Sequence, residues 1–351
     1  MTDLSSDFWL AMLAGIFAFG TALAFCRVLS RLIHPLRLLD HPNDRSLHAR
    51  PIPRTGGMAV LAGVLVGVLV NAMVMKDFSS RAGLFLGVGL APLAVISWLD
   101  DYRDIAARWR LLIHLWAAVS LPAAGFAPDS FNLPGLVLPL PSSIAVLLTL
   151  LFTVWMINLY NFMDGMDGFA GGMAVIGFTT LAWLGRADAE FTVICLVVAA
   201  AGAGFLVYNF PPAKIFLGDT GSTVLGFLAA ACSLWGSKMG LFPLWIAWLV
   251  FSPFIVDATV TLLRRLLHGE KVWEAHRSHY YQRLVLLGWG HRRTVLAEYA
   301  LMLACAGSAL LAVSLPPTAQ AVLALGWALI YSLLMWRVGR LERRRATVLA
   351  P

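Results

Sequence analysis

Apolar runs separated by short polar segments repeat along the whole chain. A transmembrane helix needs about 20 predominantly apolar residues to cross the ~30 Å hydrocarbon core of a bilayer, and eleven runs approach that length. They lie at residues 8–30, 58–75, 82–99, 111–126, 143–159, 171–184, 191–208, 223–235, 241–263, 295–313 and 319–336. The pattern predicts an all-α polytopic membrane protein with about eleven transmembrane helices, folded as one membrane-embedded domain over residues 1–351.

The composition and the placement of charge agree with this fold class. The chain is 60% hydrophobic, with a mean hydropathy of +0.78. Lys and Arg collect on the cytoplasmic side of membrane proteins, and 22 of the 26 basic residues fall in alternate segments, beginning with the one after the first run. We therefore expect a periplasmic N-terminus and a cytoplasmic C-terminus. The net charge of +7 then indicates topology and contact with anionic membrane lipids rather than nucleic-acid binding.

Two groups of residues are expected to be structural. The four cysteines lie in or beside apolar runs without the paired spacing of a metal site or a disulfide framework, so we expect small buried residues at Cys26, Cys195, Cys232 and Cys305. Residues 122–141 are punctuated by Pro and Gly and carry one charge, Asp129. This segment predicts a surface hairpin or a re-entrant turn.

Carboxylates, in contrast, gather at the cytoplasmic ends of three runs. They are Asp100, Asp101 and Asp104 in "WLDDYRD", Asp164 and Asp167 in "NLYNFMDGMDG", and Asp219 in "FLGDTGS". A single boundary carboxylate can remain solvated by snorkelling, but adjacent Asp100 and Asp101 repel each other unless a cation lies between them. A hard divalent ion, Mg²⁺ or alternatively Mn²⁺, with oxygen ligands and substrate phosphates, would remove that cost.

The glycines around these carboxylates suggest close approach of a ligand. Asp164 and Asp167 are bracketed by Gly, which lets the backbone come near a ligand, and the spacing does not fit a calcium-binding loop. The backbone N–H groups of "GDTGS", at the start of the next run, could hold phosphate or could simply form an N-cap. A carboxylate inside such a turn favours a bridging metal.

Two cationic loops complete the set of polar segments. They contain Arg45, His48 and Arg54 in "RSLHARPIPRTGG" and His276, Arg277, His279 and Arg283 in "HRSHYYQRL". Both could be ordinary positive-inside loops, and no further Cys or His stands at the spacing of a zinc site. The second loop fits a cationic lid over a diphosphate better.

Five segments in this order, "RSLHARPIPRTGG", "LDDYRD", "NLYNFMDGMDG", "NFPPAKIFLGDTGS" and "HRSHYYQRL", closely resemble the polyprenyl-phosphate N-acetylhexosamine-1-phosphate transferase family. The resemblance covers nearly the whole chain and places active-site loops at residues 31–57, 100–110, 158–170, 209–222 and 264–294. It implies transfer of a sugar-1-phosphate from a UDP-N-acetylhexosamine to undecaprenyl phosphate, with release of UMP and a requirement for Mg²⁺.

The resemblance also implies roles for individual residues. Asp219 would be the main metal ligand, Asp100 and Asp101 would lie near the metal and the lipid phosphate, and Asp100 would deprotonate that phosphate. The remaining implied catalytic residues are Asp164, Asp167, His276 and His279, and the implied substrate-binding residues are Arg45, His48, Arg54, Asn158, Asn161, Asn209, Lys214, Phe216 and Arg277. Phe216 would stack on uracil.

The last loop departs from the denser histidine run of many family members, because Arg and Ser separate His276 from His279. This form resembles the branch that initiates O-antigen or common-antigen synthesis from UDP-GlcNAc or a UDP-N-acetyl-6-deoxyhexosamine, and it argues against a muramoyl-pentapeptide donor. The resemblance implies a multi-pass protein of the bacterial inner membrane with its active site facing the cytoplasm. It also allows a homodimer.

Other classes share part of the pattern. "DDYRD" fits the DDxxD motif of membrane prenyltransferases but leaves "GDTGS" and the histidine loop unexplained. A CDP-alcohol phosphotransferase would need an Ala-Arg pair soon after its Asp-Gly, whereas "DGMDGFAGGMAVIG" continues apolar. A transporter of a lipid-linked sugar would place charges near the bilayer midplane. Only Asp257, near Pro253, is a candidate for such depth, and it could equally be a structural partner or a support of the site.

Overall fold

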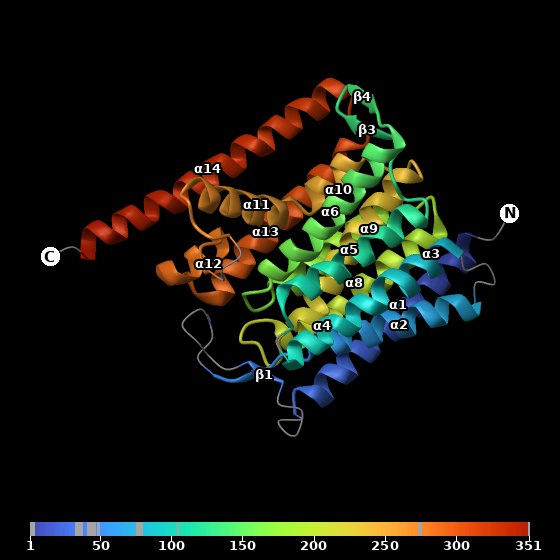
Figure 1. The fold of residues 1–351 in the computed structure, drawn as a ribbon, viewed down its shortest axis with the longest axis horizontal. Coiled ribbons are helices and arrows are strands. Elements are labelled where there is room, and N and C mark those ends of the chain that lie inside the picture. The colour runs from blue at the N-terminus through green and yellow to red at the C-terminus, as the bar shows by residue number, and fades with distance from the viewer. Residues whose placement is uncertain are drawn as a thin grey trace.

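The fold is an almost entirely helical bundle (Figure 1). The computed structural model describes residues 4–31, 38–40, 47, 50–74, 80–103, 105–272 and 276–349. Its helices are α1 (Leu4–Leu29), α2 (Gly56–Val74), α3 (Ser80–Leu84), α4 (Ala91–Arg103), α5 (Ala107–Ala123), α6 (Ser142–Phe162), α7 (Phe169–Leu184), α8 (Ala189–Asn209), α9 (Gly218–Lys238), α10 (Leu244–Val250), α11 (Ser252–Leu267), α12 (Tyr280–Leu284), α13 (Gly290–Ala312) and α14 (Pro317–Leu349), with π-helical segments η1 (Phe85–Leu90) and η2 (Val285–Trp289).

Strands are short and lie outside the bundle. β1 (Leu39–Asp40) pairs with β2 (Ile52–Pro53), and β3 (Ser130–Leu133) pairs with β4 (Leu136–Pro139), both antiparallel. The β3–β4 pair confirms the hairpin expected within residues 122–141. Figure 1 shows it at the opposite end of the bundle from β1 and α12.

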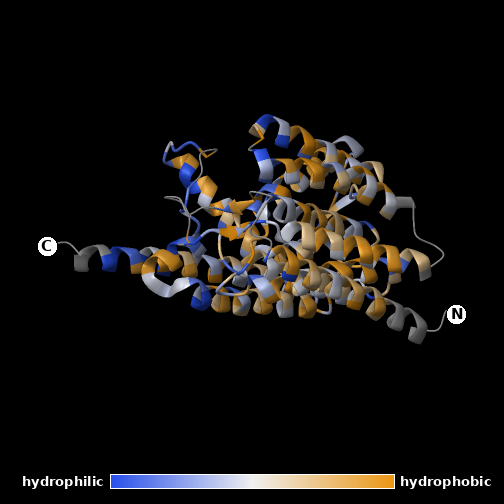
Figure 2. Ribbon diagram, turned by 90° about the horizontal axis from the view of Figure 1, so that it is seen from below, coloured by the Kyte–Doolittle hydropathy of each residue, from blue (hydrophilic) through white to orange (hydrophobic). Residues whose placement is uncertain are grey.

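Each of the eleven predicted runs coincides with a helix or a set of consecutive helices. In the described part of the chain, seven helical stretches are long and apolar enough to cross a membrane, and the bent pair of α10 and α11 would make an eighth. The shorter α7 is also apolar, while α5 and α9 belong to neither group. The protein is therefore an all-α polytopic membrane protein; eleven crossings and the orientation of the termini stay predictions. Figure 2 shows hydrophobic residues along the helices and hydrophilic ones gathered toward the end from which α14 projects.

Small residues let the first helices approach closely. Every fourth residue on one face of α1, from Ala14 through Ala18 and Ala22 to Cys26, is fully buried. A Cβ added to Gly63 of α2 would lie 2.7 Å from the Ala18 carbonyl oxygen, and one on Gly204 of α8 would lie 2.5 Å from the carbonyl oxygen of Phe19. Helices in lipid associate through such close packing, since apolar surface is already well solvated by lipid.

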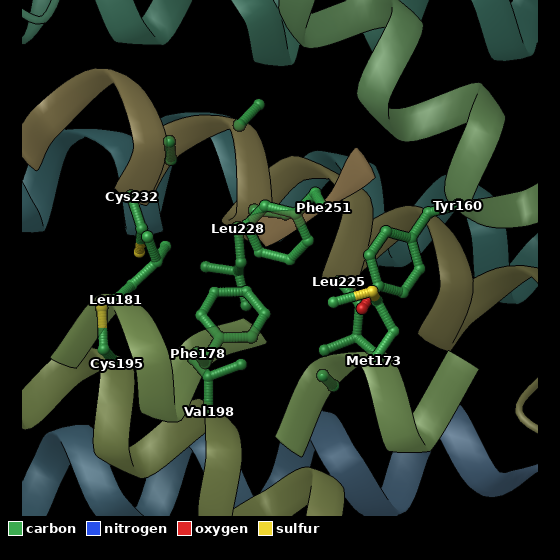
Figure 3. Close-up of a cluster of buried hydrophobic side chains, with 14 of the residues drawn as sticks. Tyr160, Met173, Phe178, Leu181, Cys195, Val198, Leu225, Leu228, Cys232 and Phe251 are labelled. Atoms are coloured by element: carbon green, nitrogen blue, oxygen red, sulfur yellow. The ribbon is translucent and has the colours of Figure 1, made fainter. Parts of the chain in front are cut away.

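Helix α9 forms the centre of the bundle, and residues 220–236 are all buried. Figure 3 shows its side chains packed among those of α6, α7, α8 and the α10–α11 corner: Tyr160, Met173, Phe178, Leu181, Cys195, Val198, Leu225, Leu228, Cys232 and Phe251. All four cysteines are free and buried, as expected. Because neighbouring helices surround α9, it tolerates the Thr, Ser and Gly residues that keep its hydropathy low.

The run at residues 241–263 does not form the single straight span that was expected. Helices α10 and α11 meet at an angle of 82°, and Phe251 ends one and caps the other. Pro253 follows in the first turn of α11. Proline has no N–H to continue the preceding helix but suits the start of a new one. The bend turns α11 toward the end of the bundle that carries the acidic segments.

Candidate active site

Five polar segments that are distant in sequence converge at one end of the bundle. They are the end of α4, the turn after α6, the start of α9, the segment after β2, and the residues from 276 to the start of α13. Two adjoining cavities lie between them. The Asp164 cavity, of about 310 Å³, and the His279 cavity, of about 450 Å³, share Asn161, Phe162, Asp219 and Gln282 in their walls. Asp219 thus stands where the two cavities meet.

Asp101 holds the start of α9. Its Oδ1 accepts from the backbone N–H of Asp219 at 2.9 Å, and its Oδ2 accepts from the N–H and the hydroxyl of Thr220 at 2.9 and 2.6 Å. A carboxylate at a helix N-terminus is favoured by the free N–H groups and by the helix dipole. In this structure a side chain of α4 thus occupies the N–H groups of Asp219 and Thr220, and phosphate binding by this turn stays a prediction. The roles of Asp101 as metal ligand and catalytic residue stay predictions.

The glycine before Asp219 is required by this arrangement. Gly218 has φ of 72°, in the left-handed region. An added Cβ would also lie 2.5 Å from the Arg54 carbonyl oxygen and 2.9 Å from Asp101 Oδ1. Only glycine combines this backbone conformation with such close neighbours. Arg54 Nη2 in turn donates to the Asp101 carbonyl oxygen at 2.6 Å, which joins the segment after β2 to α4.

Asp100 and Asp219 share one cation. Arg110 Nη1 lies 2.9 Å from Asp100 Oδ2 and 3.5 Å from Asp219 Oδ2. Asn161 Nδ2 donates to the other oxygen of Asp219 at 2.8 Å. The guanidinium marks a position between two carboxylates where positive charge is favourable, and hard oxygen donors are what Mg²⁺ prefers. The donor set therefore fits Mg²⁺.

The protein side chains alone would not complete the coordination shell of a Mg²⁺ ion here. Among the described residues, no group of three or more His, Cys, Asp and Glu side chains is arranged to hold a metal ion. Mg²⁺ commonly uses one or two carboxylates, with water and substrate phosphates completing its coordination shell. Asp100 and Asp219 together supply that number of protein ligands.

The Asp164 cavity contains a carboxylate in an unusual environment. Asp164 is half-buried, and its carboxylate has no hydrogen-bond partner within the described residues. Burial, followed by the charges of Asp219, Asp101, Asp40 and Asp167, raises the pKa of Asp164 well above its usual value. A cation or a proton is thus favoured beside this carboxylate.

Asp167 differs from Asp164 because its carboxylate is fully engaged. Oδ1 lies 3.0 Å from His291 Nδ1, and Oδ2 accepts from the N–H of Ala213 at 3.0 Å. Asn209 fixes the same turn, accepting from the Gly168 N–H at 2.8 Å and donating to the Ile215 carbonyl at 2.9 Å. In this structure Asp167 and Asn209 order the walls of the cavity; their predicted contacts with substrate stay predictions.

Residues 276–281, which we call the histidine segment, are anchored by Asp257 of α11. Asp257 Oδ1 lies 3.2 Å from His279 Nδ1 and accepts from the Tyr280 N–H at 3.0 Å, while Oδ2 accepts from the Tyr281 N–H at 3.1 Å. Asp257 thus caps α12 and fixes the tautomer of His279, so that Nε2 remains for other contacts. Of the alternatives left open for Asp257, the structure shows a structural pairing that supports this segment.

His276 lies beside His279 in the wall of the His279 cavity, with ring centroids 4.9 Å apart. Burial, together with the nearby charges of His279 and Arg265, lowers the pKa of His276 to about 4. His276 is therefore neutral near pH 7 and can donate or accept a hydrogen bond there.

The other predicted substrate-binding residues divide into three groups. Asn158 and Asn161 line the His279 cavity, and Arg54, Asn161 and Phe216 line the Asp164 cavity. Lys214 is exposed with its ammonium 5.8 Å from the Tyr208 ring centroid, and it lines neither cavity. Arg277 also lines neither, and instead faces a third cavity. The positions of Arg45 and His48 lie outside the described residues.

Sequence reasoning gave no individual role to five charged, histidine or amide residues that line these cavities: Asp40, Arg110, His114, Gln282 and His291. Arg110 was counted only as a topological charge. His114 lies 3.3 Å from Asn158 Nδ2, inside a run interpreted as purely apolar. His114 could have been recognised because a polar residue within a transmembrane span often has a functional role. His291 could have been recognised because it follows Gly290 at the beginning of an apolar run.

The sequence of the chain is similar to those of known glycosyl transferases. Residues 83–237 match Glycosyl transferase family 4. The chain is 33% identical, over 82% of its length and 81% of the relative's, to a probable undecaprenyl-phosphate N-acetylglucosaminyl 1-phosphate transferase of Bacillus subtilis (strain 168). It is 29% identical, over 76% and 75%, to a decaprenyl-phosphate N-acetylglucosaminephosphotransferase of Mycobacterium leprae (strain TN). It is 27% identical, over 94% and 93%, to an undecaprenyl-phosphate alpha-N-acetylglucosaminyl 1-phosphate transferase of Yersinia pestis. The chain belongs to the polyprenyl-phosphate N-acetylhexosamine-1-phosphate transferase family, within Glycosyl transferase family 4.

Proposed function

We propose that the protein transfers an N-acetylhexosamine-1-phosphate from a UDP-sugar to undecaprenyl phosphate and releases UMP. The observation that carries this proposal is the position of Asp219 between two adjoining cavities, with Asp100 beside it and a cation between the two carboxylates. Phosphoryl transfer between two anions depends mainly on positioning and charge neutralisation. A two-cavity site joined at a carboxylate pair is suited to that task.

The two cavities suggest where each substrate binds. The His279 cavity has apolar residues Ala107, Leu111 and Val272 in its wall, together with Asp100 and Arg110. This combination suits a phosphate carried on an isoprenoid chain. The Asp164 cavity is more polar and includes two aromatic rings, Phe162 and Phe216, against which a uracil base could stack.

Individual residues would bind the metal ion, contact phosphate and accept a proton. Asp219 and Asp100 would hold Mg²⁺, which when bound would neutralise charge on the donor diphosphate. Arg110 would contact phosphate oxygens once substrates displace it from the carboxylates. Asp100 would accept the proton of the acceptor phosphate, and His279, held by Asp257, would present Nε2 to a phosphate or sugar oxygen.

We propose UDP-GlcNAc or a UDP-N-acetyl-6-deoxyhexosamine as the donor, in the first step of O-antigen or another lipid-linked surface glycan. The spacing of His276 and His279 supports this choice over a muramoyl-pentapeptide donor. The 33% identical relative is named for N-acetylglucosamine, while phospho-N-acetylmuramoyl-pentapeptide-transferases match at 28–29% identity over 73% of the chain. A UDP-sugar is a cytoplasmic metabolite, so the site would face the cytoplasm from the inner membrane. The concentration of Lys and Arg on that side supports the same orientation.

The alternative classes gain no support from the structure. A DDxxD prenyltransferase leaves unexplained why Asp219 stands between the two cavities and why His276 and His279 line one of them. A transporter needs charges midway through the bundle, whereas the cavity-lining aspartates gather at one end.

The test is UMP release by the purified protein with undecaprenyl phosphate and Mg²⁺, run in parallel with UDP-GlcNAc, a UDP-N-acetyl-6-deoxyhexosamine and UDP-MurNAc-pentapeptide. We expect lipid-dependent release with one of the first two donors. Asp219→Ala should abolish it, whereas Asp129→Ala, which removes an exposed carboxylate on the β3–β4 hairpin, should not. Release that does not need the lipid, or equal release from Asp219→Ala, would refute the proposal.

A further inference from the structure

A third cavity, the largest of those near the site, lies on the other side of the histidine segment. It has a volume of about 700 Å³ and is lined by the end of α11, by α12, by η2 and by the end of α14. We call it the arginine cavity, after Arg264, Arg265, Arg277, Arg283 and Arg345 in its wall. It shares no lining residue with the Asp164 or the His279 cavity. The donor and acceptor sites proposed above therefore do not account for it.

The charges in the arginine cavity are not balanced within the described residues. Five arginines face two glutamates, Glu270 and Glu342. Glu270 accepts from Arg265 Nε at 2.7 Å, and Glu342 is bound by Nε and Nη2 of Arg283. Both carboxylates are thus engaged by one arginine each, which leaves excess positive charge around the cavity. An anion is the natural ligand of such a site.

Arg283 lies in the wall of the arginine cavity with one N–H group unsatisfied among the described residues. Its side chain is 9% exposed, and its Nη1 has no hydrogen-bond partner within the part of the chain that the structure describes. The ring of Tyr280 lies 4.5 Å from the guanidinium carbon. A buried guanidinium N–H without an acceptor costs free energy, so Arg283 adds unsatisfied positive charge to the wall of the cavity.

Exposed apolar side chains lie beside the arginine cavity at the end of α11. Leu263, Leu266 and Leu267 at the end of α11 are 53%, 59% and 85% exposed. A separate, mainly apolar cavity of about 610 Å³ is lined mainly by α13 and α14, with Asp257 and Glu298 also in its wall. It includes Tyr280, as the arginine cavity does. Helix α14 packs against α12, α13 and η2 and then projects beyond the bundle (Figure 1). A cationic cavity thus adjoins an apolar one beside a helix, α14, whose apolar side chains are exposed.

We propose that the arginine cavity binds the phosphate of an anionic membrane phospholipid and that the apolar cavity takes one of its acyl chains. A soluble phosphate would use the arginines but not the adjoining apolar space. An acceptor polyprenyl phosphate would need to reach Asp219, and the histidine segment separates the arginine cavity from that residue. Phospholipid headgroups also lie at the depth where helices of a membrane protein end in Arg and Tyr.

Occupancy of this site would affect the histidine segment. Arg277, Ser278 and Tyr280 line the arginine cavity, and they alternate with His276 and His279, which line the His279 cavity. A phosphate held by Arg264, Arg277 and Arg345 would therefore restrain the same stretch of backbone that presents both histidines. We expect the anionic lipid to raise turnover without contacting either substrate.

The first test measures binding directly, so it does not depend on the proposed transferase function. Native mass spectrometry in neutral detergent counts the phosphatidylglycerol and phosphatidylcholine molecules retained by the protein. We expect preferential retention of phosphatidylglycerol, weakened roughly 25-fold in the double variant Arg264→Gln/Arg345→Gln, at about fivefold for each arginine. Arg264→Gln alone, at an exposed position, should show the single step. The matched control Arg293→Gln/Arg340→Gln removes two exposed arginines that lie outside the cavity and should bind as the unmodified protein does.

Equal retention of the two lipids, or equal phosphatidylglycerol binding in both double variants, would overturn the proposal. So would binding of inorganic phosphate without binding of phosphatidylglycerol. The second test is UMP release in liposomes of phosphatidylcholine with and without phosphatidylglycerol. Stimulation by phosphatidylglycerol that survives intact in Arg264→Gln/Arg345→Gln would also contradict it. Failure of UMP release with every donor would refute only the transferase assignment and leave the binding result standing.

Discussion

Replacement of Asp257 should disorder the histidine segment while leaving the carboxylates of Asp100, Asp164 and Asp219 in place. Asp257 is 7% exposed and accepts from the backbone N–H groups of Tyr280 and Tyr281 and from His279 Nδ1. In Asp257→Ala these three donors lose their acceptor while they remain buried in the protein. Each unsatisfied donor costs about 1–3 kcal/mol. Even at the lower bound, the total of about 3 kcal/mol disfavours the ordered segment by roughly 100-fold, since about 1.4 kcal/mol corresponds to a factor of ten.

Turnover should follow the population of the ordered segment. We expect kcat of Asp257→Ala to fall on the order of 100-fold, with a small change in KM for the UDP-sugar, because among the described residues that line the Asp164 cavity only Gln282 belongs to α12. Asp257→Asn keeps one acceptor oxygen and loses the other, so its kcat should fall by roughly 5-fold to 100-fold, the equivalent of about 1–3 kcal/mol. UMP release across donor concentrations separates kcat from KM, and thermal unfolding in detergent checks that the variants are folded.

The matched control is Thr261→Val. Thr261 donates its hydroxyl to Asp257 Oδ1 at 3.0 Å but makes no contact with the histidine segment in the described hydrogen-bond network. It should keep nearly full turnover. A folded Asp257→Ala protein with more than half of the normal kcat would show that the anchoring of His279 is irrelevant to catalysis.

Three further outcomes are expected. Asp164→Asn should raise the thermal stability in metal-free buffer, and more at pH 8 than at pH 5: a raised pKa means that the folded protein binds the Asp164 proton more tightly than the unfolded chain, so wild-type stability is lost as pH rises. An equal gain at both pH values would contradict this. Gly57→Ala should cost about 1–3 kcal/mol of folding free energy, because its Cβ would lie 2.2 Å from the Gly221 nitrogen, while Gly20→Ala, with open space, should be tolerated. Arg110→Gln should lower the Mg²⁺ concentration needed for half-maximal turnover, since a competing cation is lost; a higher requirement would count against the shared site.

Hydropathy located the helices well because burial in lipid imposes the same requirement on every spanning segment. It failed at residues 241–263, where the average over the run hides the break at Phe251, and the only local sign was Pro253. It also gave no hint that α9 is the central helix. That property depends on which helices surround it, and its Thr, Ser and Gly residues are tolerated for this reason.

The position of the site was predictable, but the use of each residue was not. Carboxylates at the ends of several spans indicated one acidic end of the bundle, and the structure brings Asp100, Asp164 and Asp219 to adjoining cavities. The pairing of Asp101 with the start of α9 joins residues 118 positions apart. Such a cap arises from tertiary packing and leaves no local pattern. The same holds for Arg110, whose charge could be assigned to topology until its distance from Asp219 was known.

The balance of charge around the two cavities constrains how phosphates can enter. In the described part of the chain six aspartates and two arginines line them: Asp40, Asp100, Asp101, Asp164, Asp167 and Asp219, with Arg54 and Arg110. A UDP-sugar and a lipid phosphate would add further negative charge, so the site needs additional cations to hold both. Arg277, assigned to the diphosphate on sequence grounds, lies in the arginine cavity and does not supply that charge here. Among the described residues, Arg54 and Arg110 are the arginines available for this role. The charge balance therefore supports the proposal that a divalent ion binds at Asp219, independently of the ligand set.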